Sequence, residues 1–347
     1  MTISPYTNRA ALRNNDDFFG RRRELHQIYT LILKGLSISL VGERRVGKSS
    51  ILFALQFEEK RREFSVPDTV VFVSINGQYF VDSEEGDVIE YLLDQTAQEA
   101  GTSTHGTTRD LLRQMGRELL DTRPRRQLVV LMDEVDVLVH NEKIAAKFFS
   151  FLRAWTEEFQ IPFVIASREG SIEGLVETEG AGSPFWNIFK SVYVGPMERA
   201  EADDLVRMPA SRLALPFTDE EVTYLFSLGG YQPFFLQIAC DHLFTAKSQD
   251  PVVDFDKVTQ AFRSEAYPHV EYLLRRLPSS ERDALAVFAQ TQSPPDRKGR
   301  SELLRKGVLV QDTAGLRLFS SVLSDLFTNK PNLKSTLAQK ANDLLFG

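Results

Sequence analysis

Short apolar runs alternate with longer amphipathic stretches over the first half of the chain. Apolar residues of segment 22–34 recur at helical spacing and stop at Gly35, which is typical of a residue just past a helix end. A short apolar run at 37–41 and a helical pattern at 48–62 follow. The alternation then continues, with strands expected at 70–75, 128–132, 163–166 and 192–194 and helices at 88–100, 110–121 and 142–159. Continuous apolar strands that alternate with helices predict an α/β fold, a five-stranded parallel sheet flanked by helices.

The pattern changes at Pro196, beyond which helical stretches are separated by Pro-Phe or Gly-Gly breaks. Helices are expected at 201–206, 220–228 and 234–244, then at 281–290 and 300–306. Two short apolar runs, 308–311 and 316–319, flank a turn and suggest the hairpin of a winged helix. We therefore expect five parts: a polar lead at 1–17, a sheet domain at 18–198, a helical subdomain at 199–268, a winged-helix domain at 269–328 and a tail helix at 329–347.

Composition narrows the class of protein without fixing its partner. With 347 residues and 42% hydrophobic residues, the chain can form more than one core. Cys240 is the single cysteine and cannot form an internal disulfide, so we expect a reducing compartment, the cytoplasm. We find no apolar run long enough to span a membrane and no signal-peptide core. The net charge of −7 argues against a protein whose main task is to coat nucleic acid.

The loop from Gly42 to Ser49 has the spacing GxxxxGK[ST], between an expected strand and an expected helix. The glycines allow backbone amides to turn toward a phosphate, and the helix N-terminus adds a favourable dipole. We expect Lys48 to reach the β- and γ-phosphate oxygens of ATP or ADP, and Ser49 to bind Mg²⁺. The phosphate-binding residues that we predict are Gly42, Arg45, Val46, Gly47, Lys48, Ser49 and Ser50.

Two carboxylates follow the apolar run at 128–132. Ligands of open α/β sheets collect at the carboxyl ends of the strands, so Asp133 and Glu134 are expected beside the phosphate loop. We predict that Asp133 belongs to the Mg²⁺ shell and that Glu134 orients and deprotonates the attacking water. The alternative is an acidic, solvated strand end.

Other polar residues have two interpretations from sequence alone. Ser167 or Arg168, after the run at 163–166, can sense the γ-phosphate, or Arg168 can pair with an acid such as Asp136. Arg44 and Arg45 suit either a phosphate clamp or an exposed interaction surface. The segment Phe19 to Leu25 either wraps the nucleotide base or is an ordinary helix start with solvated arginines. Arg153 is an arguable arginine finger, although a surface salt bridge fits its position better.

Together these motifs resemble the STAND branch of P-loop ATPases, relatives of AAA+ proteins, over roughly 18–327. The resemblance implies that Phe19, Gly20 and Arg21 contact adenine, and that Arg168 acts as sensor 1 and is catalytic beside Glu134 and Lys48. It also implies that segment 228–236 is a lid motif whose Pro233 packs near the nucleotide. Replication initiators of the AAA+ class usually carry a sensor 2 arginine at about that place, so Pro233 favours a switch over a ring motor. STAND proteins usually join this module to an effector domain and a repeat sensor, which we do not find in this sequence. The usual input and output are therefore expected on other proteins, or the chain is part of a larger polypeptide.

The resemblance implies a nucleotide-gated switch with slow, Mg²⁺-dependent ATP hydrolysis. ADP is expected to hold the lid and winged helix against the sheet domain, and ATP to open them for self-association or for binding an effector or sensor protein. The alternative is a DNA-binding initiator or remodeller that reads DNA with its winged helix. The basic residues around the expected recognition helix motivate it, although a solvated helix face is the more common meaning of such a run. These residues are Arg297, Lys298, Arg300, Arg305 and Lys306.

Overall fold

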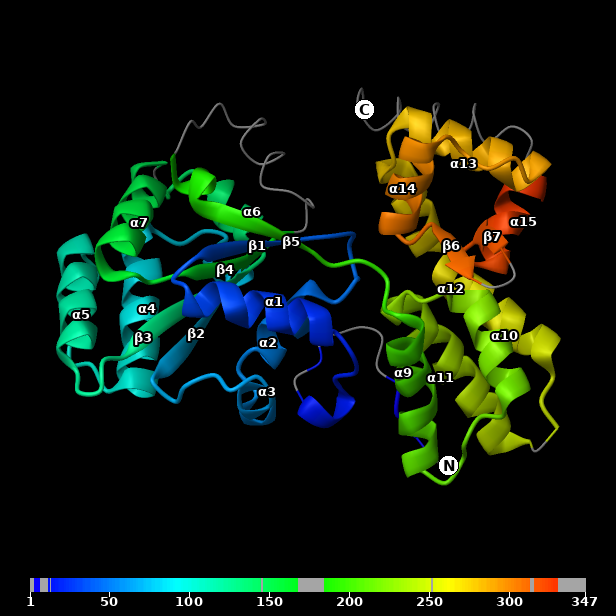
Figure 1. Cartoon of the computed structure of the whole chain (residues 1–347), viewed down its shortest axis with the longest axis horizontal. Helices are drawn as coiled ribbons and strands as arrows, with labels where there is room; N and C mark the ends of the chain where they lie inside the picture. Colours follow the sequence, from blue (N-terminus) through cyan, green and yellow to red (C-terminus); the bar gives the residue numbers. More distant parts are fainter. Residues whose placement is uncertain are drawn as a thin grey trace. The chain divides into compact units, whose positions relative to one another are not determined.

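The computed structural model describes residues 3–6, 12, 14–144, 146–167, 184–250, 252–312 and 315–329 (Figure 1). The chain forms two compact units. The sheet unit is Ala11–Val194, and the helical unit joins Met1–Ala10 to Gly195–Gly347. The first residues of the chain therefore belong with its C-terminal half. The expected tail helix at 329–347 lies almost entirely outside the described residues.

A parallel sheet of five strands organises the sheet unit, as the alternation of apolar runs predicted. The strand order is β2-β3-β4-β1-β5, and every neighbouring pair is parallel. The strands are β1 (Ser37–Val41), β2 (Val70–Asn76), β3 (Gln127–Asp133), β4 (Phe163–Ala166) and β5 (Phe189–Tyr193). Since parallel strands end at the same edge, the segments after β1, β3 and β4 are brought together.

Alternate side chains of the strands enter two separate hydrophobic cores, one on each face. Along β2, Val71 and Val73 pack with helices α4 (Glu85–Ala100), α5 (Arg109–Asp121) and α7 (Ala146–Phe159). Val70 and Phe72 point the other way, into the core formed with α1 (Arg22–Leu33) and α2 (Lys48–Ala54). Figure 1 displays these helices on both sides of the sheet. This two-sided burial explains why the strands are apolar without a polar alternation.

Two expected elements differ in the structure. The single helix expected at 48–62 is wrong, because the chain breaks after α2 and restarts as α3 (Glu58–Glu63). Phe57 is extended there, and α3 has acidic residues in its first turn and basic residues in its last, which stabilise a separate short helix. The last strand begins at Phe189 rather than at residue 192 and follows η3 (Pro184–Ile188). The short elements η1 (Asn15–Asp17), η2 (Gly77–Phe80) and α6 (Val135–Val139) complete the described part of the sheet unit.

The helical unit contains helices followed by an antiparallel hairpin, the order that the sequence predicted. The expected boundary at residues 268 and 269 falls inside α12, so the division into lid and winged helix stays a prediction. The elements are α9 (Arg199–Arg212), α10 (Asp219–Gly229), α11 (Pro233–Gln249), α12 (Phe255–Arg276), α13 (Ser279–Thr291), α14 (Arg297–Arg305), β6 (Leu309–Asp312), β7 (Gly315–Leu318) and α15 (Ser321–Asn329).

A joint between side chains and backbone ties the start of α11 to the segment after α14. The buried Gln232 donates from Nε2 to the Lys306 carbonyl at 3.0 Å. A Cβ on Gly307 would lie 2.3 Å from that amide nitrogen and 2.5 Å from Cγ of Pro196. Gly307 also has a φ of +69°, in the left-handed region, so only glycine fits there without strain.

Trp155 should be the largest single contributor to the core between α5 and α7. It is 1% exposed, and its Nε1 donates to the Leu112 carbonyl at 3.0 Å. We expect Trp155→Ala to lower the free energy of unfolding by about 3–5 kcal/mol. Urea denaturation followed by circular dichroism measures this change. Tyr79→Ala, at a side chain 67% exposed, is the control and should stay within about 0.5 kcal/mol of the wild type. Equal transitions for the two variants would contradict this account of the core.

Candidate functional site

The loop between β1 and α2 has a backbone that only glycine permits at two positions. Gly47 has a φ of +103°, and a Cβ placed on it would meet no atom within 4 Å, so it borders open space. A Cβ on Gly42 would lie 2.2 Å from the carbonyl oxygen of Val194. The loop therefore packs tightly against the end of the sheet at Gly42 and stays open at Gly47, where a ligand can approach the backbone.

Lys48 begins α2 and folds its side chain back across the loop. Its Nζ donates to the Gly42 carbonyl at 2.7 Å and to the Glu43 carbonyl at 3.1 Å, and the residue is only 8% exposed. The ammonium group is thus fixed within the loop, where the sequence predicted it to meet phosphate oxygens.

The side chains of Asp133 and Ser49 are in contact, although the two residues lie 84 positions apart in the sequence. In the sheet, β4 lies between β3, which ends at Asp133, and β1, which precedes α2. The Ser49 hydroxyl hydrogen-bonds to the Asp133 carboxylate, which also accepts from the Glu134 backbone N–H at 3.0 Å. Burial raises the pKa of Asp133, and the Glu134 carboxylate raises it further, while the Ser49 bond and the Lys48 charge oppose the shift. The hydroxyl and the carboxylate offer oxygen ligands that suit Mg²⁺, and the nearby Lys48 ammonium suits the phosphates of a nucleoside triphosphate.

Glu134 has a left-handed backbone, with φ 51° and ψ 45°, which is uncommon for a residue other than glycine. Gly77 packs against it so closely that a Cβ there would lie 2.3 Å from the Glu134 carbonyl oxygen. Asn76 ends β2 directly opposite Asp133 in the strand register. Sequence reasoning missed Asn76 and Gly77, although a polar residue and a glycine directly after a buried strand were a readable signal.

The Arg21 side chain is buried, with 4% of its surface exposed, and contacts the backbone of the phosphate loop. Its Nη2 donates to the Val46 carbonyl at 2.9 Å, and Nη1 lies 3.4 Å from Oε1 of Glu24. Arg21 therefore supports the backbone of the phosphate loop, a role that the sequence did not suggest. The contact of Phe19, Gly20 and Arg21 with adenine stays a prediction.

The remaining predicted residues lie in different surroundings. Val46 is 2% exposed and packs into the core beside α1, so only its backbone is available to a phosphate, whereas Arg45 is exposed. Ser50 accepts a hydrogen bond from the Leu12 backbone N–H at 3.2 Å. Arg168 lies outside the described residues, and Pro233 is the first residue of α11, in the helical unit.

A cavity of about 580 Å³ opens at the opposite end of the sheet from the phosphate loop. Ser37 and Gln127 line it, and these residues begin β1 and β3. The phosphate loop and Asp133 follow or form the other ends of the same strands. The cavity is therefore separated from the predicted chemistry by the length of the strands.

The described helices include none that is long and apolar enough to cross a membrane.

Comparison with known structures finds the same fold over most of the chain. A Walker-type ATPase of Pyrococcus abyssi is similar with a TM-score of 0.59 and 15% identity, over 92% of this chain and 99% of that one. The ORC2 protein of Aeropyrum pernix in its ADP form is similar with a TM-score of 0.56 and 14% identity, over 95% and 97% of the two chains.

No curated protein matches the sequence. A family model does match it, that of "Novel STAND NTPase 2", over residues 30–294, which is more than half of the chain. The matched range contains the phosphate loop, the Asp133–Glu134 pair and the start of α11. With its parallel sheet and phosphate loop, the chain belongs to the novel STAND NTPase 2 family of P-loop nucleoside triphosphatases.

Proposed function

We propose that this protein is a nucleotide-gated switch that binds ATP or ADP and hydrolyses ATP slowly. The observation that carries the proposal is the meeting of Ser49, Asp133 and Lys48 at one edge of the sheet. Magnesium, when bound there by Ser49 and Asp133, would neutralise charge on the β- and γ-phosphate oxygens. Lys48 would contribute a second positive charge to the same oxygens.

Glu134 is the proposed general base. Its carboxylate would accept a proton from a water whose oxygen attacks the γ-phosphorus, while the bond to the bridging oxygen breaks and ADP leaves. The left-handed backbone of Glu134, held against Gly77, supports this role because strained residues concentrate at functional sites.

The residues at the start of α11 support slow, regulatory ATP hydrolysis rather than rapid turnover. Pro233 begins the helix, and two phenylalanines follow it. Across the 17 residues of α11 the only lysine or arginine is Lys247, which is engaged with Glu221 at 2.6 Å. This helix therefore offers no arginine to the γ-phosphate, and the lid is proposed to move with the nucleotide without driving fast turnover. ATP would shift the equilibrium only as far as it binds the open state more tightly than the closed one.

The proposed output is self-association or binding of a separate effector or sensor protein. A winged-helix reader of DNA remains the second candidate, since Arg297 and Lys298 of α14 are exposed. The other basic residues favour a structural role: Lys306 pairs with Glu281 at 2.7 Å, Arg305 with Glu302, and Arg300 donates to Gln311. Binding to duplex DNA that weakens steeply with salt would support the second candidate instead.

ATP should change the oligomeric state of the protein. We expect a non-hydrolysable ATP analogue with Mg²⁺ to increase the mass measured by light scattering, while ADP does not. Lys48→Ala should abolish nucleotide binding and the mass change together, because the phosphates lose their buried cation. Lys190→Ala, at an exposed position of β5, is the matched control. A mass that is the same with ADP and with the ATP analogue would exclude self-association as the output.

Glu134→Gln should separate binding from hydrolysis. Removal of the general base is expected to slow phosphate release by about 10²–10³-fold, with nucleotide affinity nearly unchanged. Single-turnover hydrolysis and equilibrium titration measure the two quantities. Glu142→Gln makes the same chemical change at an exposed position and should have no effect. Equal rates for wild type and Glu134→Gln would show that Glu134 is not the base.

Asp133→Asn should stabilise the nucleotide-free protein while weakening Mg²⁺-dependent ATP binding. The folded pKa of Asp133 is raised above its ordinary value of 3.8, mainly by burial. The free energy of unfolding is therefore highest below that ordinary value, where Asp133 is protonated in the folded and the unfolded protein. It falls as pH rises through the folded pKa. The gain in Tm from Asp133→Asn should be largest at neutral pH and shrink as pH falls toward about 4. A gain that grows on acidification would contradict the burial of an ionised carboxylate.

A further inference from the structure

The cavity at the amino ends of β1 and β3 is lined mainly by polar residues. Its volume of about 580 Å³ lies within the range of small-molecule pockets, about 300–1,000 Å³. Three cationic residues, Lys34, Arg125 and Arg126, line it, and Glu157 is the one acid among the described lining residues. All four belong to the sheet unit. The cavity therefore has the size and the charge to hold an anionic small molecule.

The two arginines are held in position by neutral oxygen atoms. Nη2 of Arg125 donates to Oε1 of Gln160 at 3.1 Å. Nη1 of Arg126 donates to the carbonyl of Ala100, the last residue of α4. A guanidinium has five N–H donors, so each arginine keeps N–H groups that no described residue accepts. These contacts fix the places of the two positive charges without neutralising them.

The carboxylate of the lining does not neutralise these cations. Oε1 of Glu157 accepts a hydrogen bond from Nε of Arg153 at 2.9 Å, so this acid is already paired. Among the residues that the structure describes, Lys34, Arg125 and Arg126 have no carboxylate within ion-pair distance. The cavity therefore carries an excess of positive charge, in a chain whose net charge is −7.

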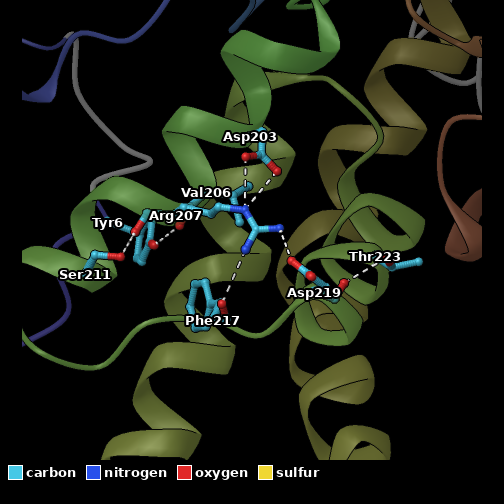
Figure 2. Close-up of polar contacts among 8 residues, drawn as sticks. All are labelled: Tyr6, Asp203, Val206, Arg207, Ser211, Phe217, Asp219 and Thr223. Atoms are coloured by element: carbon cyan, nitrogen blue, oxygen red, sulfur yellow. Dashed lines mark hydrogen bonds and ion pairs between the residues drawn. The ribbon is translucent and has the colours of Figure 1, made fainter.

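A guanidinium of the helical unit shows the opposite arrangement. Arg207 donates to both carboxylate oxygens of Asp203, at 3.0 and 2.9 Å, and to Asp219 at 2.7 Å. Figure 2 shows this side chain between α9 and the first turn of α10, with both carboxylates turned toward it. The charge of Arg207 is therefore neutralised within the fold, whereas the charge of Arg125 is left for a ligand.

The helix ends beside the cavity offset only part of this positive charge. Lys34 follows α1, Arg126 contacts the last residue of α4, and Gln160 follows α7. Each helix C-terminus is equivalent to roughly half a negative charge, so the ends of α1, α4 and α7 offset about half of the three positive charges. The Ile32 carbonyl at the end of α1 is also already bonded, by Nε2 of Gln127 at 3.0 Å. The remaining positive charge is available to an anion.

We propose that this cavity is a binding site for a phosphorylated small molecule, separate from the phosphate loop. Phosphate oxygens would accept hydrogen bonds from the guanidinium groups of Arg125 and Arg126, whose planar fork suits them, and from the ammonium group of Lys34. The rest of the molecule would pack against Leu36 and Ile188, apolar residues of the same lining. The site does not depend on the switch function proposed above, because it shares no residue with the phosphate loop or the Asp133–Glu134 pair.

Chemical modification of arginine in the native full-length protein tests the site. The probes are inorganic pyrophosphate and AMP, without Mg²⁺, added to the Lys48→Ala protein, in which the phosphate loop is expected to be empty. Either probe, at ten times its dissociation constant, should slow the modification of Arg125 by phenylglyoxal by about tenfold. Arg123, which is exposed and lies outside the lining, should be modified at an unchanged rate. Mass spectrometry of the peptides distinguishes the two arginines.

Substitution of the cations tests whether they bind the probe. Arg125→Gln and Lys34→Gln, each made in the Lys48→Ala protein, should weaken probe binding by about fivefold or more, because a charged donor to phosphate is lost. Arg123→Gln removes the same charge outside the cavity and should bind like the parent protein. All three side chains are exposed, so the variants should fold. Isothermal titration calorimetry measures the dissociation constants.

The results that would overturn the site are distinct from a failure of the switch. If neither probe protects Arg125, or if Arg123→Gln weakens binding as much as Arg125→Gln does, the cavity is not a site for phosphorylated small molecules. Protection of Arg125 by a single-stranded oligonucleotide, but by neither probe, would overturn the proposal in favour of a nucleic-acid backbone. A protein that shows no ATP-dependent assembly but binds a probe through Arg125 would contradict the switch function and leave this site standing.

Discussion

The hydrogen bond between Ser49 and Asp133 is the contact on which the rest of the site depends. It connects the helix after β1 to the end of β3 across the intervening strand β4. A buried carboxylate is costly to keep ionised, and here one hydroxyl, one backbone N–H and the nearby Lys48 offset part of that cost. The charge of the ionised Asp133 carboxylate is therefore unfavourable in the nucleotide-free protein, and a divalent cation bound beside it would offset that cost. Burial of the Asp133 carboxylate therefore lowers the stability of the fold at the site where Mg²⁺ is proposed to bind.

The sheet and the phosphate loop were predictable because each follows from local signals. The strands are buried on both faces, so they read as continuous apolar runs, and the loop has a fixed spacing of glycine, lysine and serine. The break between α2 and α3 was missed because the apolar periodicity continues through Leu55, which is itself fully buried. Periodicity reports which face is buried, and it does not report where backbone hydrogen bonds are interrupted.

The support of the site was less predictable than its chemistry. Arg21 looks from sequence like a nucleotide contact or a solvated charge, and in the structure its guanidinium holds the Val46 carbonyl. Gly77 has no side chain to suggest a role, and its importance comes from the approach of Glu134, 57 positions later in the numbering. Such contacts between distant segments have no local pattern. They require the topology of the sheet before they can be recognised.

The joint between Gln232, Lys306 and Gly307 has a mechanical consequence. Because Gly307 leaves no space for a side chain between Gln232 and Pro196, the start of α11 and the end of α14 cannot slide past each other by small steps. A rotation of α11 would therefore also move the end of α14 and strand β6, which begins two residues after Gly307. The start of α11, the end of α14 and strand β6 would thus respond to a load as one rigid block.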